Sequence, residues 1–166
     1  MRESELHDHI DRRSRGLSGA FSQVVVGPGD DAAIVRTGTT DSGTLQAITV
    51  DQLIASRHFD PALLDSPEGR DLVARKAIAR SISDLAAVAA SPRWSLATAA
   101  LPASFKHADD LFDRMFAWAN HWRCPLVGGD IAATTGPLTL TVTAAGDTFE
   151  LEIEKIGTLR NRIVKP

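Results

Sequence analysis

The chain has 166 residues, 43% of them apolar and 23% charged, so it is long enough to bury a core as one domain with at most a short appendage. A net charge of −3 at pH 7 gives no electrostatic basis for binding nucleic acid or an anionic membrane. The single cysteine, Cys124, excludes a disulfide within this chain and a cysteine-based zinc site. We expect it to be a small buried apolar residue.

The start of the chain is charged and is not followed by the apolar stretch of a signal peptide. No run of apolar residues reaches the length of a membrane span. We therefore expect a cytoplasmic protein without a membrane partner. Residues 3–13 predict a short amphipathic helix, because Leu6 and Ile10 form a narrow apolar stripe among charged residues.

The rest of the chain alternates between strand-like and helix-like patterns. Apolar residues that alternate with polar ones predict strands, and apolar residues three or four positions apart predict helices. In chain order we expect strands at 24–26, 32–35 and 45–51, a loop at 60–67, a helix at 68–90, a strand at 94–101, a helix at 108–122, a short buried strand at 125–127 and a strand at 138–145. We expect Ser91-Pro92 to end the first long helix, because the residue before a proline avoids the helical region.

These elements predict an α+β domain, with a four-stranded mixed or antiparallel sheet and helices on one face. Two helices cover one side of such a sheet, so its other side would expose apolar and β-branched residues. We expect that side to pair with a second copy of the chain about a twofold axis. The alternative is a threonine-rich face that is polar enough to stay in water, because threonines alternate along residues 138–145.

Four acidic sites stand next to glycine turns or within predicted elements. They are Asp30 with Asp31 after Gly27-Pro28-Gly29, Asp51 at a strand end, Asp84 in an alanine-rich helix, and Asp130 after Gly128-Gly129. Each has a plain structural alternative: two glycine turns, a strand end and a polar helix edge. Taken together, carboxylates that converge repel one another unless cations neutralise them, and Mg²⁺ carrying a polyphosphate would do so. Gly128-Gly129 adds backbone that can approach a phosphate closely.

The chain contains no P-loop, kinase catalytic-loop, zinc-protease or serine-hydrolase motif. We therefore expect any phosphate chemistry to use aspartate and magnesium on another scaffold.

Five segments, in order, resemble the amino-terminal domain of thiamine-monophosphate kinases and, more broadly, the aminoimidazole-ribonucleotide-synthetase superfamily. They are Gly27-Pro28-Gly29-Asp30-Asp31-Ala32-Ala33, Thr49-Val50-Asp51-Gln52-Leu53 with His58-Phe59, residues 76–87, Gly128-Gly129-Asp130, and Leu140-Thr141-Val142-Thr143-Ala144. The resemblance runs over residues 3–147, and His58-Phe59 and the Ser-Asp-Leu-Ala-Ala run favour the thiamine kinase branch. We therefore expect the ATP- and Mg²⁺-binding half of this superfamily at 1–147, and a tail without assigned function at 148–166.

The resemblance implies transfer of the γ-phosphoryl group of ATP to thiamine monophosphate, giving thiamine diphosphate, in a sheet-to-sheet homodimer that closes a barrel. It implies Mg²⁺, no covalent enzyme intermediate, and catalysis by positioning and charge neutralisation. By position, the metal ligands would be Asp31, Thr49, Asp51, Asp84 and Asp130; Asp30, Gly129 and Asp130 would bind ATP, and His58 would face the thiamine phosphate.

The chain departs from the family pattern in places. Val50 stands where the family usually has a hydroxyl residue, and Ser81 stands where it usually has an asparagine. Family members run about twice as long, with a second domain that completes the cleft, so a separately encoded second half is a candidate partner. Residues 150–162 resemble instead the carboxyl terminus of fumarylacetoacetate-hydrolase-type proteins. We expect one extra strand there and assign it no chemistry.

Two other functions stay open from the sequence. One is a non-catalytic nucleotide-binding or dimerisation module that lacks the second domain. The other is a different ATP-dependent activity of the superfamily, such as that of aminoimidazole ribonucleotide synthetase.

Overall fold

A computed structural model of the chain describes residues 3–38, 43–148, 151–153 and 157–159. The elements in chain order are α1 (Glu3–Ser14), α2 (Leu17–Ala20), β1 (Val24–Val26), β2 (Ala33–Thr37), β3 (Thr44–Ile54), the 3-10 helix η1 (Pro61–Asp65), α3 (Pro67–Ala87), β4 (Ala90–Pro102), α4 (Ala108–His121), β5 (Leu126–Thr134), β6 (Thr139–Thr148), β7 (Leu151–Ile153) and β8 (Gly157–Leu159). No helix in these ranges is both long enough and apolar enough to span a membrane.

The chain divides into two compact units. The first comprises Met1–Thr49, Asp84–Ser91 and Gly146–Pro166, and the second comprises Val50–Ser83 and Pro92–Ala145. The α+β class is confirmed, and the main sheet is mixed, with β1–β2 and β2–β3 antiparallel and β4–β5 parallel. The prediction of four strands is wrong: all six predicted strands join one sheet in the order β1-β2-β3-β6-β4-β5.

The first unit contains the two amino-terminal helices and the strands β1 and β2. Gly16, in the left-handed conformation at φ 85°, separates α1 from the short helix α2, which the sequence did not predict. The predicted stripe of α1 stays exposed, with Leu6 at 44% and Ile10 at 42%. In the tail, β7 and β8 pair as a two-stranded antiparallel sheet, where the sequence predicted one strand.

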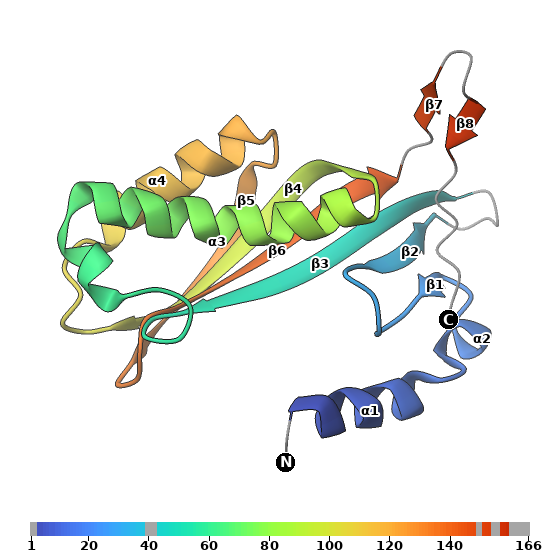
Figure 1. The fold of residues 1–166 in the computed structure, drawn as a ribbon, viewed down its shortest axis with the longest axis horizontal. Helices are drawn as coiled ribbons and strands as arrows, with labels where there is room; N and C mark the ends of the chain where they lie inside the picture. The colour runs from blue at the N-terminus through green and yellow to red at the C-terminus, as the bar shows by residue number, and fades with distance from the viewer. Residues whose placement is uncertain (1–2, 39–42, 149–150, 154–156, 160–166) are drawn as a thin grey trace. The chain divides into compact units, whose positions relative to one another are not determined.

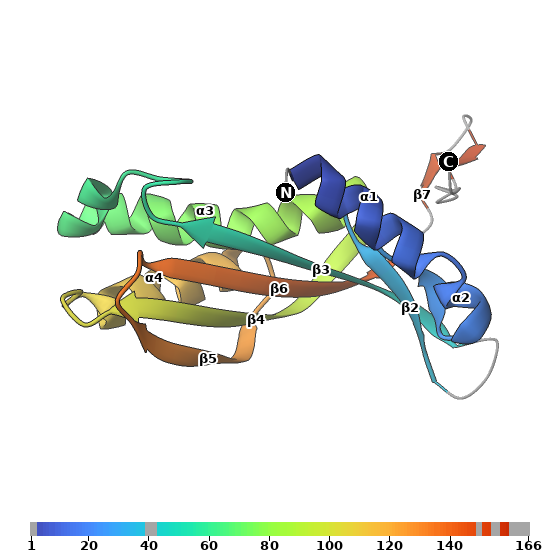
Figure 2. The same cartoon turned by 90° about the horizontal axis from the view of Figure 1, so that it is seen from below.

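In the second unit, α3 and α4 lie on the same face of β4, β5 and β6 (Figures 1 and 2). Apolar residues that alternate along the strands point to these helices and form the core, because successive side chains of a strand face opposite sides. The core residues are Leu53, Ala55, Leu64, Val73, Ala74, Ala77, Ile78, Ala97, Ala99, Leu111, Met115, Ala119, Leu138, Leu140 and Val142.

Local sequence signals explain where α3 begins and ends. The Ser66 hydroxyl accepts a hydrogen bond from the Gly69 N–H at 3.0 Å, which caps the helix, and Pro67 occupies its first position. The helix ends at Ala87, and Ala89 takes a positive φ of 55° before β4. Pro92 therefore lies inside β4 and does not stop the helix as predicted.

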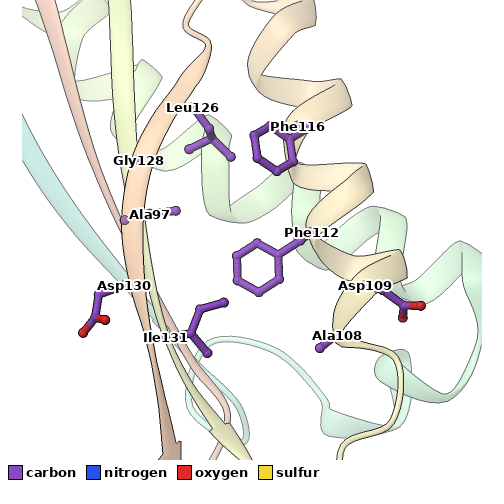
Figure 3. A pocket seen from close by; sticks show the side chains of 10 residues that line it. Ala97, Ala108, Asp109, Phe112, Phe116, Leu126, Gly128, Asp130 and Ile131 are labelled. Carbon is purple, nitrogen blue, oxygen red and sulfur yellow. The ribbon is translucent and has the colours of Figure 1, made fainter.

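The strand β5 differs most from its prediction. The sequence predicted a short buried strand and then a glycine turn, but β5 is nine residues long, and Gly128-Gly129-Asp130 lies within it. Most of β5 is exposed, and its residues pair in parallel with β4, Gly129 opposite Ala97 and Asp130 opposite Thr98. Ile131 points toward α4, whereas Asp130 points to the other side of the strand (Figure 3).

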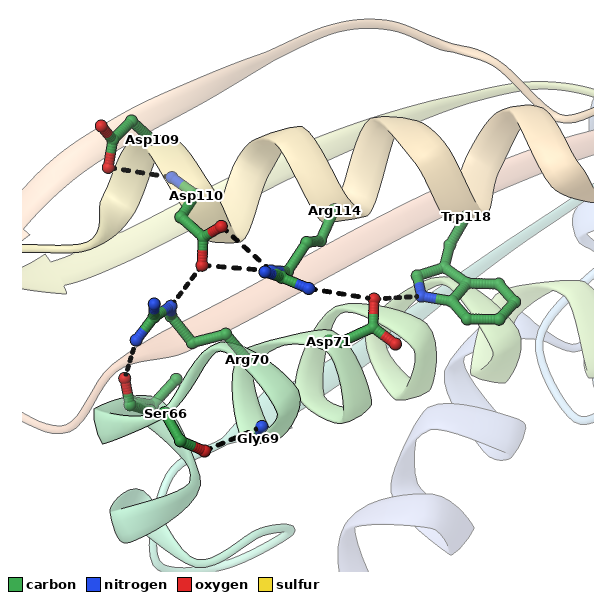
Figure 4. A network of polar contacts seen from close by, with 9 residues as sticks. Ser66, Gly69, Arg70, Asp71, Asp109, Asp110, Arg114 and Trp118 are labelled. Atoms are coloured by element: carbon green, nitrogen blue, oxygen red, sulfur yellow. Dashed lines mark hydrogen bonds and ion pairs between the residues drawn. The ribbon is translucent and has the colours of Figure 1, made fainter.

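A network of charged groups joins α3 to α4 (Figure 4). Arg70, with 7% of its side chain exposed, contacts the Asp110 carboxylate and donates to the Leu64 carbonyl at 2.8 Å. Arg114 also donates to Asp110 at 3.1 Å. Hydrogen bonds from Arg114 and Arg70 lower the pKa of Asp110 to about 2, so its carboxylate stays charged at neutral pH. The Trp118 indole N–H donates to Asp71 at 3.1 Å and extends the network along the helices.

Candidate functional site

Thr49 and Asp84 are two predicted metal ligands that the structure brings together. The Thr49 hydroxyl donates a hydrogen bond to the Asp84 carboxylate at 2.8 Å, although the two residues are 35 positions apart. Thr49 is buried on β3, with 4% exposed, and Asp84 lies in the last turn of α3. The last turn of a helix carries partial negative charge, so a carboxylate there favours a nearby cation.

The geometry of this pair suits Mg²⁺. Adjacent ligands of an octahedral magnesium ion, each about 2.1 Å from the metal, lie about 2.9 Å apart. The Thr49 and Asp84 oxygens are 2.8 Å apart, so both can be neighbouring ligands without a large movement. A hydroxyl and a carboxylate are also the oxygen ligands that Mg²⁺ prefers. These two residues therefore fit the metal that the sequence predicts.

Asp51, the third predicted ligand in this part of the chain, already has a cationic partner. Arg80 Nη2 lies 2.6 Å from Asp51 Oδ1, and the Gln52 N–H donates to the same oxygen at 2.9 Å. The sequence analysis missed this ion pair, since its two residues are 29 positions apart and belong to different elements. A cation that binds Asp51 has to compete with Arg80 for the carboxylate.

Asp30 and Asp31 lie in the loop between β1 and β2, not at the opening of a strand, since β2 begins at Ala33. Gly29 takes a φ of 119°, which favours glycine, and turns the chain there. Asp30 Oδ1 accepts a hydrogen bond from the Asp31 N–H at 2.8 Å. Both aspartates are exposed.

Gly129 and Asp130 occupy the middle of β5. A Cβ on Gly129 would lie 1.7 Å from the Ala97 carbonyl oxygen, so the close approach of β4 to β5 by itself requires a glycine here. Beside them, a groove of about 650 Å³ runs between β5 and α4, and its lining includes Phe112, Phe116 and Ile131. Asp130 and Asp109 point away from the middle of this groove (Figure 3), so the groove is apolar and carries no acid–base pair.

His58 lies in the turn that follows β3, and its ring is held by the backbone. The Nδ1 atom accepts a hydrogen bond from the Ile54 N–H at 2.9 Å, and Lys76 Nζ donates to the His58 carbonyl at 2.6 Å. Lys76 is a second residue that the sequence analysis did not single out. Cys124 is buried, as predicted, and burial raises the pKa of its thiol, which argues against a role as a nucleophile.

The predicted site residues are thus placed in two sets. The first unit holds Asp30, Asp31, Thr49 and Asp84, and the second holds Asp51, His58, Gly129 and Asp130. Within the residues that the structure describes, no three histidine, cysteine, aspartate or glutamate side chains form a group that could hold a metal ion. The Thr49–Asp84 pair is therefore the direct contact between predicted ligands, and the convergence of the other carboxylates stays a prediction.

Comparisons with known proteins agree on one family. The family model described as "AIR synthase related protein, N-terminal domain" matches residues 29–148. The thiamine-monophosphate kinase of Bacillus subtilis is 33% identical over 147 residues, which cover 87% of this chain and 42% of that protein. The kinase of the same name from Salmonella typhimurium is 38% identical over 120 residues, covering 72% of this chain and 34% of that protein. The chain thus spans less than half the length of these relatives.

Solved structures give the same answer. The structure of AaThiL complexed with AMPPCP and TMP superposes with a TM-score of 0.68 at 26% identity, and the match covers 89% of this chain and 44% of that one. The thiamine monophosphate kinase from Aquifex aeolicus superposes with a TM-score of 0.63 at 23% identity, with the same shares covered, which supports the fold alone.

Proposed function

The chain belongs to the family of AIR synthase related proteins, and on that premise we propose that it is the ATP- and magnesium-binding half of a thiamine-monophosphate kinase. The proposed reaction transfers the γ-phosphoryl group of ATP to thiamine monophosphate and gives thiamine diphosphate. The observation that carries the proposal is the Thr49–Asp84 contact, because it places two oxygen ligands on different elements at the separation that Mg²⁺ requires. Similarity to proteins named thiamine-monophosphate kinase supports the choice of acceptor.

In this proposal, Thr49 and Asp84 hold Mg²⁺, and Asp31, Asp51 and Asp130 complete its protein ligands. The bound metal would bridge phosphate oxygens of ATP and neutralise their charge. Gly129 offers backbone without a side chain to the phosphates, and Asp30 and Asp130 lie at the nucleotide. His58 contacts the phosphate of thiamine monophosphate. Catalysis then consists of positioning and charge neutralisation, without a covalent intermediate.

The length of the relatives favours one alternative. The chain covers 42% of the Bacillus subtilis kinase, so further substrate contacts would come from a second domain or from a separate chain. Without them, the chain would act as a nucleotide-binding or dimerisation module that does not turn over substrate. A cytoplasmic location stays a prediction from the sequence.

ATP consumption separates the two functions. We expect the chain to consume ATP only when thiamine monophosphate and Mg²⁺ are both present, and to stop when a chelator removes the metal. Thiamine diphosphate should form in equal amount to the ADP. Nucleotide binding that depends on Mg²⁺, but without ADP formation, would support the non-catalytic module. Binding of an ATP analogue that ignores the chelator would contradict both.

We also propose that the chain forms a homodimer through the face of the sheet opposite α3 and α4, which would close a barrel. No element of the second unit covers that face (Figure 2). It exposes Val50 at 62% and Leu96 at 37%, beside the half-buried Thr139, Thr141 and Thr143. Pairing the same surface in two copies would bury these apolar groups at once.

Sedimentation tests the dimer. We expect the mass of two chains at low micromolar concentration, and a shift toward dimer as the concentration rises. The exposed Val50 lies on the proposed interface, so Val50→Asp should give monomers, whereas Phe116→Asp, on the exposed side of α4, should not. A single monomer mass over the whole range would mean that the threonine-rich face stays in water.

A further inference from the structure

The turn that follows β3 holds the His58 ring through the backbone of one residue. Both main-chain polar groups of Ile54 bind His58: the Ile54 N–H donates to His58 Nδ1 at 2.9 Å, and the Ile54 carbonyl accepts from the His58 N–H at 2.8 Å. The Ser56 N–H donates to the Phe59 carbonyl at 2.9 Å and closes the same turn. Ser56 takes a φ of 65° there, an unusual backbone for a residue other than glycine.

These contacts decide which ring nitrogen carries the proton. A neutral imidazole has one N–H donor and one bare nitrogen that accepts. Because Nδ1 accepts from the Ile54 N–H, the proton has to lie on Nε2. A second proton on Nδ1 would face the Ile54 N–H and would break that hydrogen bond. The ring therefore presents Nε2–H as a donor, and no residue in the described part of the chain accepts from it.

Lys76 supports the turn from α3. Its ammonium donates to the His58 carbonyl at 2.6 Å, across 18 positions of sequence. This short, charge-assisted bond ties the turn to a helix that packs on the core, so it limits the freedom of the His58 backbone. An ammonium group has three donors, and it also brings a positive charge close to the ring.

From these contacts we propose that His58 is locked as the neutral Nε2–H tautomer, and that this N–H is the donor offered to a phosphate monoester. We further propose that Lys76 is the positioning residue that keeps the turn, and with it the ring, in this orientation. The proposal rests on the proposed function, which places His58 at the phosphate of thiamine monophosphate. It adds the atom that makes the contact and the residue that positions it.

Nitrogen NMR of the ring tests the lock without any ligand. Two-bond ¹H–¹⁵N correlations distinguish the two neutral tautomers and show whether they exchange. We expect His58 in the ligand-free chain to show the pattern of Nε2–H alone. In Lys76→Met we expect a mixture or an averaged pattern, and in Lys76→Arg we expect the single pattern to return. Lys106→Met is the matched control, because Lys106 also donates to a backbone carbonyl, that of Ala103 at 3.3 Å, but away from the turn.

Binding of thiamine monophosphate then tests the donor role. We expect the ligand to shift the His58 Nε2 signal, and we expect His58→Ala to weaken its binding about tenfold or more, since a hydrogen bond to a charged group is lost. Lys76→Met should weaken it several-fold without changing the affinity for an ATP analogue, and Lys106→Met should change neither.

The outcomes separate this proposal from the proposed function. An Nδ1–H pattern, or tautomers in exchange in the unaltered chain, would overturn the lock, whatever the chain binds. A Lys76→Met spectrum equal to that of the unaltered chain would overturn the positioning role. Thiamine monophosphate that binds without moving the His58 signals would overturn the donor role. A chain that shows the locked tautomer but binds no thiamine monophosphate would instead contradict the proposed acceptor.

Discussion

Asp84→Asn is expected to weaken the Mg²⁺-dependent binding of a non-hydrolysable ATP analogue by about 100-fold or more. Replacing the groups that merely support a metal ligand costs about 10- to 100-fold in metal affinity, so loss of a ligand's own charge should cost at least that. Asparagine keeps the shape of the side chain and can still accept the Thr49 hydrogen bond. The change therefore removes charge with little change in packing.

Calorimetric titration with the analogue measures this effect, with Mg²⁺ and then with chelator. Asp113→Asn is the matched control, because Asp113 is an exposed aspartate of α4 and its replacement changes the net charge equally. Thr49→Val should weaken binding less than Asp84→Asn, because it removes a neutral ligand, and Thr49→Ser should restore most of it. If Asp84→Asn bound the analogue like the unaltered chain, Asp84 would be the polar helix edge that its sequence position alone suggests.

The parts of the fold with short-range patterns were predictable from sequence. The helix at 108–122 carries apolar residues at helical spacing, and α4 covers Ala108–His121. The alternation around 138–145 likewise gave β6, with Leu140 and Val142 buried. In both cases the residues that decide the structure are neighbours along the chain. The sheet size was wrong, because joining six strands depends on pairings between segments far apart in sequence.

Candidate site residues followed the same division. Thr49 and Asp84 could be named from the resemblance, but their 2.8 Å contact depends on how β3 and α3 meet. The partners Arg80 and Lys76 were missed, because an arginine or a lysine on a helix usually serves a solvated surface. Their roles depend on Asp51 and on the His58 carbonyl, both far away in sequence.

Gly128-Gly129 was read as a turn, because glycine pairs most often mark turns and loops. In the structure the pair lies inside β5, where β4 passes close to the backbone of Gly129. Glycine in a strand interior marks such an approach when packing leaves no room for a Cβ. Sequence alone does not distinguish these two uses, since both need the same residue.

Gly129→Ala is expected to destabilise the chain by about 3 kcal/mol, the upper end of the usual cost of overpacking. The added Cβ would lie 1.7 Å from the Ala97 carbonyl oxygen and 2.8 Å from its carbon, and both atoms are backbone. Backbone cannot move aside as a side-chain end does, so β5 has to shift away from β4. The loss should appear as a lower urea midpoint and as faster amide exchange in β4 and β5, without nucleotide present.

Gly128→Ala is the matched control, one residue away on the same strand. Its Cβ would meet only the Leu96 side chain, at 3.3 Å from the flexible Cδ2 methyl. Alanine also narrows the unfolded ensemble, which favours folding by about 0.4–1 kcal/mol, so Gly128→Ala should be close to neutral. Equal stability of the two variants would mean that β5 lies further from Ala97 than the structure places it. Gly129 would then be a glycine for the sake of a phosphate, and its replacement should harm nucleotide binding while leaving the fold intact.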